Sequence, residues 1–117
     1  MISLALPVDI YLSTTPADMR KSFDGLFALA VNHLGRDPLR GGLFVFLNRR
    51  RDRMKLLYWD GDGLAVWAKR LEAGTFQMPA ADASSRSVSL SATELTLLLR
   101  GIDLGSVKQR KRYRRSA

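Results

Sequence analysis

Residues 43–71, LFVFLNRRRDRMKLLYWDGDGLAVWAKRL, contain three strand-like runs separated by two polar turns. The first run, 43–47, is wholly apolar, as is typical of a short central strand. The runs 54–60 and 64–71 combine aromatic and aliphatic residues, and the Asp-Gly-Asp-Gly sequence of 60–63 between them is typical of a tight turn. The stretch therefore predicts an antiparallel meander with an arginine cluster at one hairpin tip and two aspartates at the other.

Upstream of this stretch, the sequence predicts one strand and one helix. Apolar and polar residues alternate with period two over 8–13, which indicates a half-buried strand. The apolar residues of 22–34 recur at helical spacing, and Gly35 stands where a helix commonly ends. Gly25 lies inside this helix at a cost of about 1 kcal/mol relative to Ala, which indicates either close backbone packing or a later helix start.

Downstream, residues 74–86 are rich in Ala, Ser and Asp and predict a loop, and Val88 and Leu90 predict a further short strand. Ser91-Ala92-Thr93-Glu94 has the pattern of a capping box, in which two side chains satisfy free backbone N–H groups at a helix start. The helix that follows has an apolar stripe formed by Leu95, Leu98, Leu99 and Ile102.

Together these elements predict an α+β fold: a small antiparallel β-sheet, a meander of about four to five strands, packed with two main helices. The 117 residues suit a single domain, which we expect to span residues 1–104. Residues 105–117 contain charge without apolar periodicity, so they predict a flexible basic tail.

Two segments hold most of the formal net charge of +8. The tail is one: it has six basic residues and no acid, and without it the chain has 13 basic and 11 acidic residues. Its basic residues are Lys108, Arg110, Lys111, Arg112, Arg114 and Arg115. The hairpin tip is the other, with Arg49, Arg50, Arg51 and Arg53, followed by Lys55.

Arginine on a rigid hairpin can hold phosphates with its planar fork, and a basic tail adds salt-sensitive affinity for nucleic acid. The two segments therefore predict a nucleic-acid site. The alternative is solvent-exposed charge without a specific ligand. Tyr58, Trp59, Trp67 and Phe76 are suited to base stacking if exposed, but aromatics in alternating strands are more often core residues, so we assign most of them to packing.

The composition gives little support for catalysis, metal binding or cofactor binding. The chain has no Cys and one His, which leaves a metal site dependent on carboxylates, and no phosphate-binding glycine loop occurs. Asp60 and Asp62 are the best carboxylate pair for a nuclease, but their spacing is the one a hairpin turn requires. We expect no enzyme, metal, cofactor or small-molecule substrate. The N-terminus resembles neither a signal peptide nor a membrane span, so we expect a cytoplasmic protein without a membrane partner.

Several segments together resemble a known family. They are 18–26 (DMRKSFDGL), 43–46 (LFVF) with its arginine-rich turn, 55–64 (KLLYWDGDGL), 69–76 (KRLEAGTF) and the closing region 90–103. In order and spacing they are similar to the small accessory proteins, often called TnpB, of IS-66-type bacterial insertion sequences, and the resemblance covers nearly the whole chain. It implies a helper in transposition beside a separate transposase. The tail is the part that departs from the pattern.

The resemblance also draws attention to Asp18, Arg20, Lys21 and Asp24, a polar motif at a strand-to-helix junction. It indicates an interaction motif, with a local network of ion pairs and caps as the alternative. Our leading hypothesis is a non-catalytic accessory protein of transposition that binds DNA or helps to assemble the transposase–DNA complex. The alternative is a protein-interaction module that contacts the transposase without touching DNA.

Overall fold

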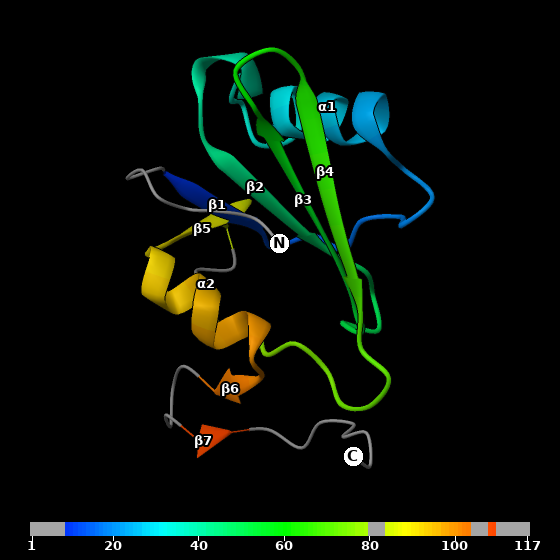
Figure 1. The fold of residues 1–117 in the computed structure, drawn as a ribbon, viewed down its shortest axis with the longest axis vertical. Coiled ribbons are helices and arrows are strands. Elements are labelled where there is room, and N and C mark those ends of the chain that lie inside the picture. Colours follow the sequence, from blue (N-terminus) through cyan, green and yellow to red (C-terminus); the bar gives the residue numbers. More distant parts are fainter. Residues whose placement is uncertain (1–8, 80–83, 104–107, 110–117) are drawn as a thin grey trace.

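One mixed β-sheet of five strands organises the chain in the computed structural model, which describes residues 9–79, 84–103 and 108–109 (Figure 1). The spatial order is β4-β3-β2-β1-β5. The strands are β1 (Ile10–Ser13), β2 (Leu43–Leu47), β3 (Arg53–Trp59), β4 (Leu64–Arg70) and β5 (Ser87–Leu90). The helices are α1 (Phe23–Asn32), α2 (Ala92–Leu99) and a short 3₁₀ helix, η1 (Pro38–Arg40). The α+β class, the five strands and the two main helices are confirmed.

The sheet is mixed, whereas the sequence predicted an antiparallel one. Strands β2, β3 and β4 form the expected antiparallel meander, with the two predicted turns at its opposite ends. However, β1 pairs with β2 in parallel, with Ile10 opposite Leu43, and pairs antiparallel with β5. The reason is the connection between β1 and β2: it contains α1, and such a crossover returns the chain to the end at which the first strand began.

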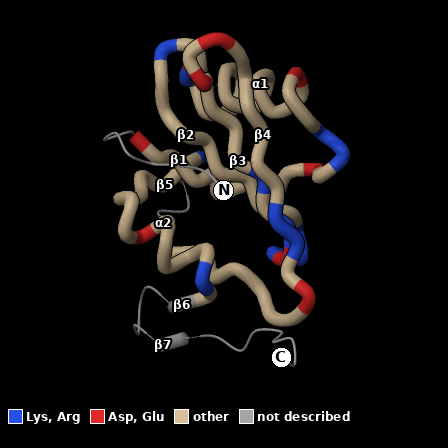
Figure 2. Tube along the Cα trace, in the orientation of Figure 1, with Lys and Arg blue, Asp and Glu red and all other residues tan. Residues whose placement is uncertain are grey.

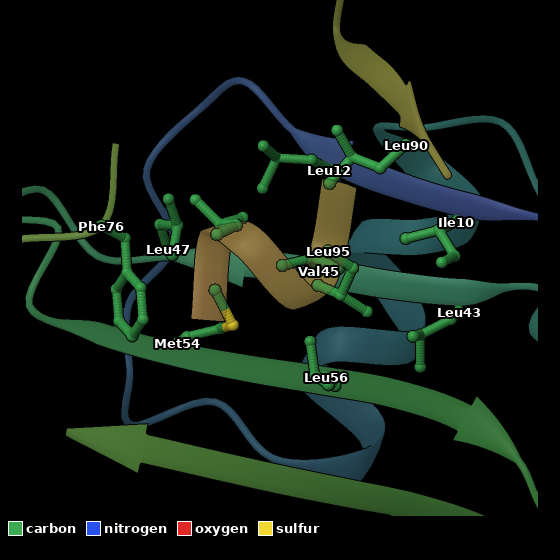
Figure 3. Packing of buried hydrophobic residues seen from close by; sticks show 11 residues of the cluster. Ile10, Leu12, Leu43, Val45, Leu47, Met54, Leu56, Phe76, Leu90 and Leu95 are labelled. Carbon is green, nitrogen blue, oxygen red and sulfur yellow. The ribbon is translucent and has the colours of Figure 1, made fainter. Parts of the chain in front are cut away.

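Helices on both faces of the sheet explain why β2 is apolar at every position. Leu43, Val45 and Leu47 belong to the core on the α2 side (Figure 3), and Phe44 and Phe46 belong to the core on the α1 side. All five residues are buried. Figure 1 shows α1 and α2 on different sides of the sheet, which leaves β2 with no solvent-facing side chain.

The predicted capping box at the start of α2 is confirmed. The Ser91 hydroxyl accepts a hydrogen bond from the Glu94 N–H at 3.0 Å, and the Glu94 carboxylate accepts one from the Ser91 N–H at 2.9 Å. After α2, β6 (Ile102–Asp103) and β7 (Lys108–Gln109) pair antiparallel as a second, two-stranded sheet. The rest of the predicted tail lies outside the described residues. None of the helices in the described part of the chain is long and apolar enough to cross a membrane.

Candidate nucleic-acid interface

The arginine turn between β2 and β3 has a defined backbone that one asparagine organises. The Asn48 carbonyl accepts a hydrogen bond from the Arg51 N–H at 3.1 Å, while the Asn48 side-chain oxygen accepts from the N–H groups of Asp52 and Arg53, each at 3.0 Å. The Asn48 amide donates to the Asp52 carboxylate at 2.7 Å. Arg51 itself has φ 60, in the left-handed region. The turn therefore presents its arginines from an ordered loop.

The segment after β4 stabilises this turn through two backbone hydrogen bonds. The Leu71 N–H donates to the Asp52 carbonyl and the Phe76 N–H donates to the Arg51 carbonyl, both at 2.7 Å. The Phe76 side chain is fully buried in the core on the α2 side (Figure 3). Phe76 thus belongs to packing, as expected, and it also anchors a segment that the sequence identified only as a loop.

The loop between β1 and α1 reaches the same end of the sheet. The Ala17 N–H donates to the Leu47 carbonyl at 2.8 Å, at the last residue of β2. Further along the loop, the Lys55 ammonium of β3 donates to the Lys21 carbonyl at 2.8 Å. These two bonds fix the predicted 18–21 motif beside the first residues of β3.

Within this loop, Asp18 and Arg20 form an ion pair with several bonds. The Asp18 carboxylate accepts from the Arg20 Nε at 3.0 Å, from Nη2 at 2.6 Å and from the Arg20 backbone N–H at 2.9 Å. The Arg20 side-chain bonds, followed by the backbone bond, lower the pKa of Asp18 from 3.8 to about 2. Asp24 lies in the first turn of α1, and the ion pairs of the described residues do not include it. The predicted motif is therefore a local network only in its Asp18–Arg20 part.

A groove of about 530 Å³ lies between this loop and the ends of β3 and β4. We call it the strand-end groove; its lining residues are Met19, Arg53, Met54, Lys55, Ala68, Lys69, Arg70 and Glu72. The strand register puts Arg53 directly opposite Arg70 and Lys55 opposite Ala68. Both pairs face the α1 side of the sheet, because Leu57, two residues beyond Lys55, packs in the α1-side core.

The basic residues of the turn, the loop and the groove gather at one end of the molecule, which we call the basic end. Figure 2 shows their blue segments on the same side of the chain. The basic end contains nine basic and three acidic residues, which gives it a net charge of +6. The other described residues include five basic and seven acidic ones. The basic residues are Arg20, Lys21, Arg49, Arg50, Arg51, Arg53, Lys55, Lys69 and Arg70, and the acidic ones are Asp18, Asp52 and Glu72.

The structure thus brings together two groups of residues that the sequence treated separately, the arginine turn and the 18–21 motif. The sequence analysis named Lys69 and Arg70 only as part of the 69–76 segment of the family resemblance, and not among the nucleic-acid-binding residues. The signal for them was present in the register: counting outward from the 60–63 turn pairs Arg70 with Arg53. Of the basic tail residues, Lys108 lies in β7, where its backbone pairs with Asp103, and the other five lie outside the described residues.

The carboxylates of 60–63 have the geometry of a turn. The Asp60 N–H donates to the Gly63 carbonyl at 2.8 Å, and the Asp62 N–H donates to the Asp60 carbonyl at 2.9 Å. Gly61 adopts φ 78, which only glycine accepts readily. Over the described residues, no group of three or more His, Cys, Asp or Glu side chains is arranged to hold a metal ion.

Comparison with known proteins gives a family and two relatives. Residues 8–109 match the family model described as IS66 Orf2 like protein. Two proteins of Sinorhizobium fredii, the uncharacterized proteins y4jC and y4hO, are similar over most of their length. The first is 36% identical over 110 residues, covering 94% of this chain and 92% of the relative. The second is 35% identical over 96 residues, covering 82% of each. No solved structure matches the chain significantly.

Proposed function

Because the chain belongs to the IS66 Orf2-like family, we propose that it serves transposition as a non-catalytic accessory protein that binds DNA with its basic end. Family membership implies the accessory role in transposition. The observation that carries the proposal of DNA binding is the net charge of +6 gathered at one end, against −2 over the other described residues.

The chemistry of the basic end suits the sugar-phosphate backbone. Six of its nine basic residues are arginines, whose fork holds a phosphate with two parallel hydrogen bonds. Phosphate contacts of this kind position a protein on DNA without reading its sequence, and they make the affinity strongly dependent on salt. In this proposal Arg49, Arg50, Arg51, Arg53 and Lys55 contact phosphates, and the basic residues of the tail extend the contact.

A salt-titrated binding assay on element-end duplex DNA tests the proposal. The variant Arg49→Ala/Arg50→Ala/Arg51→Ala removes three charges from the turn, and we expect it to bind roughly tenfold more weakly and to lose about 3 from the slope of log K against log salt. The matched control, Arg40→Ala/Arg86→Ala/Arg100→Ala, removes three charges outside the basic end and should bind like the wild type. Equal binding by the wild type and the turn variant would refute DNA binding through the turn.

A second function, contact with the transposase, is favoured by exposed apolar side chains on α1. Phe23 is 48% exposed and Val31 is 40% exposed, although both continue the apolar pattern of the helix. Phe23 and Val31 lie near the two ends of α1, and large apolar side chains left exposed along one helix offer a surface for contact with another protein. Under this alternative, the α1 surface binds the transposase and the basic residues do not contact DNA.

A pull-down against the transposase separates the two functions when nuclease is present to remove bridging DNA. The variant Phe23→Ser/Val31→Ser should lose the transposase if α1 is the contact, and the turn variant should retain it. Capture of transposase that is lost on nuclease treatment would instead indicate an association through DNA.

A further inference from the structure

The strand-end groove contains a charge arrangement that opposes folding. Arg53 and Arg70 stand directly opposite each other on paired strands and on the same face. Like charges in this position destabilise a sheet. Among the described residues, the ion pair that relieves this is the one between Arg70 and Glu72, at 3.2 Å, and both of its side chains are more than half exposed. Such a pair contributes little in water.

The groove also has a floor and a wall that leave room for a ligand. Ala68, the residue opposite Lys55, is exposed and small, so no large side chain covers the sheet between the charged groups. Met19 of the loop before α1 forms the facing wall. The space of about 530 Å³ is open to solvent along the edge strand β4.

Lys55 links the groove to the 18–21 loop. One N–H of its ammonium is used on the Lys21 carbonyl at 2.8 Å, and an ammonium has three donors. Two donors therefore remain while the bond to the loop limits where the ammonium can move. In the same loop, Arg20, whose side chain is 92% exposed, is held by its bonds to Asp18.

From this geometry we infer that the strand-end groove is a phosphate site for the nucleic-acid backbone, contacted by Arg53, Lys55 and Arg70, with the 18–21 loop as its wall. A phosphodiester seated there neutralises the repulsion between Arg53 and Arg70. The inference rests on the proposed DNA binding and assigns the 18–21 motif to the nucleic-acid site, where it is not available as the transposase contact.

The first test compares three double variants in the salt-titrated duplex assay. The groove variant Arg53→Gln/Arg70→Gln keeps long side chains over the groove and removes both charges. We expect it to bind roughly tenfold more weakly than the charge-matched control Arg40→Gln/Arg100→Gln, with a salt slope lower by about 2. If the groove variant binds like the control while Arg49→Gln/Arg50→Gln binds weakly, the groove inference is wrong and the proposed function stands. If all three bind like the wild type, both are wrong.

A gain-of-function variant gives a test that misfolding cannot imitate. Glu72→Gln removes the carboxylate that competes for Arg70, so we expect it to bind duplex DNA about two- to threefold more tightly than the wild type. Unchanged or weaker binding by this variant, with an unchanged melting temperature, contradicts the inference.

The source of the phosphate is tested by NMR on the whole protein. A short DNA duplex should shift the backbone amide signals of Lys55, Ala68 and Arg70, and inorganic phosphate at the same concentration should leave them in place. Equal shifts with both ligands would indicate a free-anion site and overturn the inference. A nuclease-treated pull-down in which the groove variant loses the transposase, while its DNA affinity is unchanged, would overturn it in favour of a protein contact.

Discussion

At the scale of single residues, Arg51 is the side chain whose position has the clearest conformational cost. Its φ of 60 costs a non-glycine residue about 1–2 kcal/mol, and glycine avoids that cost but loses about 0.5–1 kcal/mol through its larger entropy in the unfolded chain. We therefore predict that Arg51→Gly raises the free energy of unfolding by about 0.5–1 kcal/mol in a urea titration. If the side chain contacts DNA, the same variant binds duplex DNA several-fold more weakly.

Arg51→Ala is the matched control for this prediction. Alanine keeps the strained φ and removes the same guanidinium, so it should lose DNA affinity to the same extent without gaining stability. A stability gain in both variants would attribute the effect to the loss of charge repulsion at the turn, and a gain in neither would show that the left-handed conformation costs little there.

The Asp18–Arg20 pair makes a prediction about pH. Because bonding to Arg20 lowers the pKa of Asp18 to about 2, the contribution of the pair to stability is complete above the ordinary pKa of 3.8 and is lost as the pH falls towards 2. We expect an NMR titration of the Asp18 carboxyl to have its midpoint about 2 in the wild type and at a higher pH in Arg20→Ala, which loses the side-chain bonds and keeps the backbone N–H bond. A wild-type midpoint near 3.8 would mean that the exposed pair does not persist in solution.

At the scale of elements, Gly25 is the residue of α1 that lies against Lys21, in the loop beside the strand-end groove. A Cβ added at Gly25 would lie 3.0 Å from Cβ and Cγ of Lys21, which is tighter than ordinary packing. Gly25→Ala gains about 1 kcal/mol of helix propensity, and Lys21, an exposed loop residue, must move to make room. We expect a change in unfolding free energy of less than about 1 kcal/mol, displaced amide signals at Lys21 and Lys55, and weaker DNA binding.

The control for Gly25→Ala is Ala28→Gly, one turn further along α1 and exposed. It should cost about 1 kcal/mol of stability through helix propensity and leave DNA binding unchanged. If Gly25→Ala also leaves DNA binding and the Lys55 signal unchanged, the 18–21 loop does not depend on the glycine for its position.

On the opposite face of the sheet, the cap of α2 predicts an effect on stability alone. Ser91→Ala removes the hydroxyl that accepts from the Glu94 N–H, and the loss of such a cap costs about 1 kcal/mol. Because Arg53, Lys55 and Arg70 lie on the face of the sheet opposite to α2, we expect DNA affinity to stay within twofold of the wild type while the urea midpoint falls. Weaker DNA binding under conditions in which the variant is fully folded would indicate that α2 takes part in the DNA interface.

The elements themselves were predictable to different extents, for physical reasons. The meander, both of its turns and the α2 cap follow from local chemistry, since periodicity, glycine turns and capping residues act within a few positions. The parallel pairing of β1 with β2 was not predictable, because it depends on where the chain returns after α1. The attachment of the segment around Phe76 to the arginine turn was also missed, because its neighbours have loop composition and its contacts are distant in sequence.

At the scale of the whole molecule, folding creates a charge asymmetry that the sequence indicated only in part. The arginine turn was predictable because its charges are consecutive. The meeting of Lys21, Lys55 and Arg70 was not, because these residues lie on a loop and two strands that the sheet register and the bond from Lys55 to the Lys21 carbonyl bring together. A net of +6 at one end and −2 over the remaining described residues orients the domain towards a polyanion without any contribution from the basic residues of 110–115.

The basic tail leads to a prediction about non-specific DNA affinity, which we expect it to supply in addition to the affinity of the folded basic end. The family match ends at residue 109, and the five basic residues beyond it are Arg110, Lys111, Arg112, Arg114 and Arg115. A chain truncated after Gln109 should keep its melting temperature, lose up to about 5 from the salt slope, and lose affinity equally for element-end and unrelated DNA.

Replacing those five residues with Gln in the full-length chain should reproduce the truncation, because we assign the effect to charge and not to chain length. The groove variant, by comparison, should lose its two units of salt slope on top of the truncation, since its charges sit on the folded sheet. If the truncated protein keeps the wild-type salt slope, the tail makes no phosphate contact and the basic end alone accounts for binding. A truncation that removes all DNA binding would instead make the folded basic end insufficient by itself.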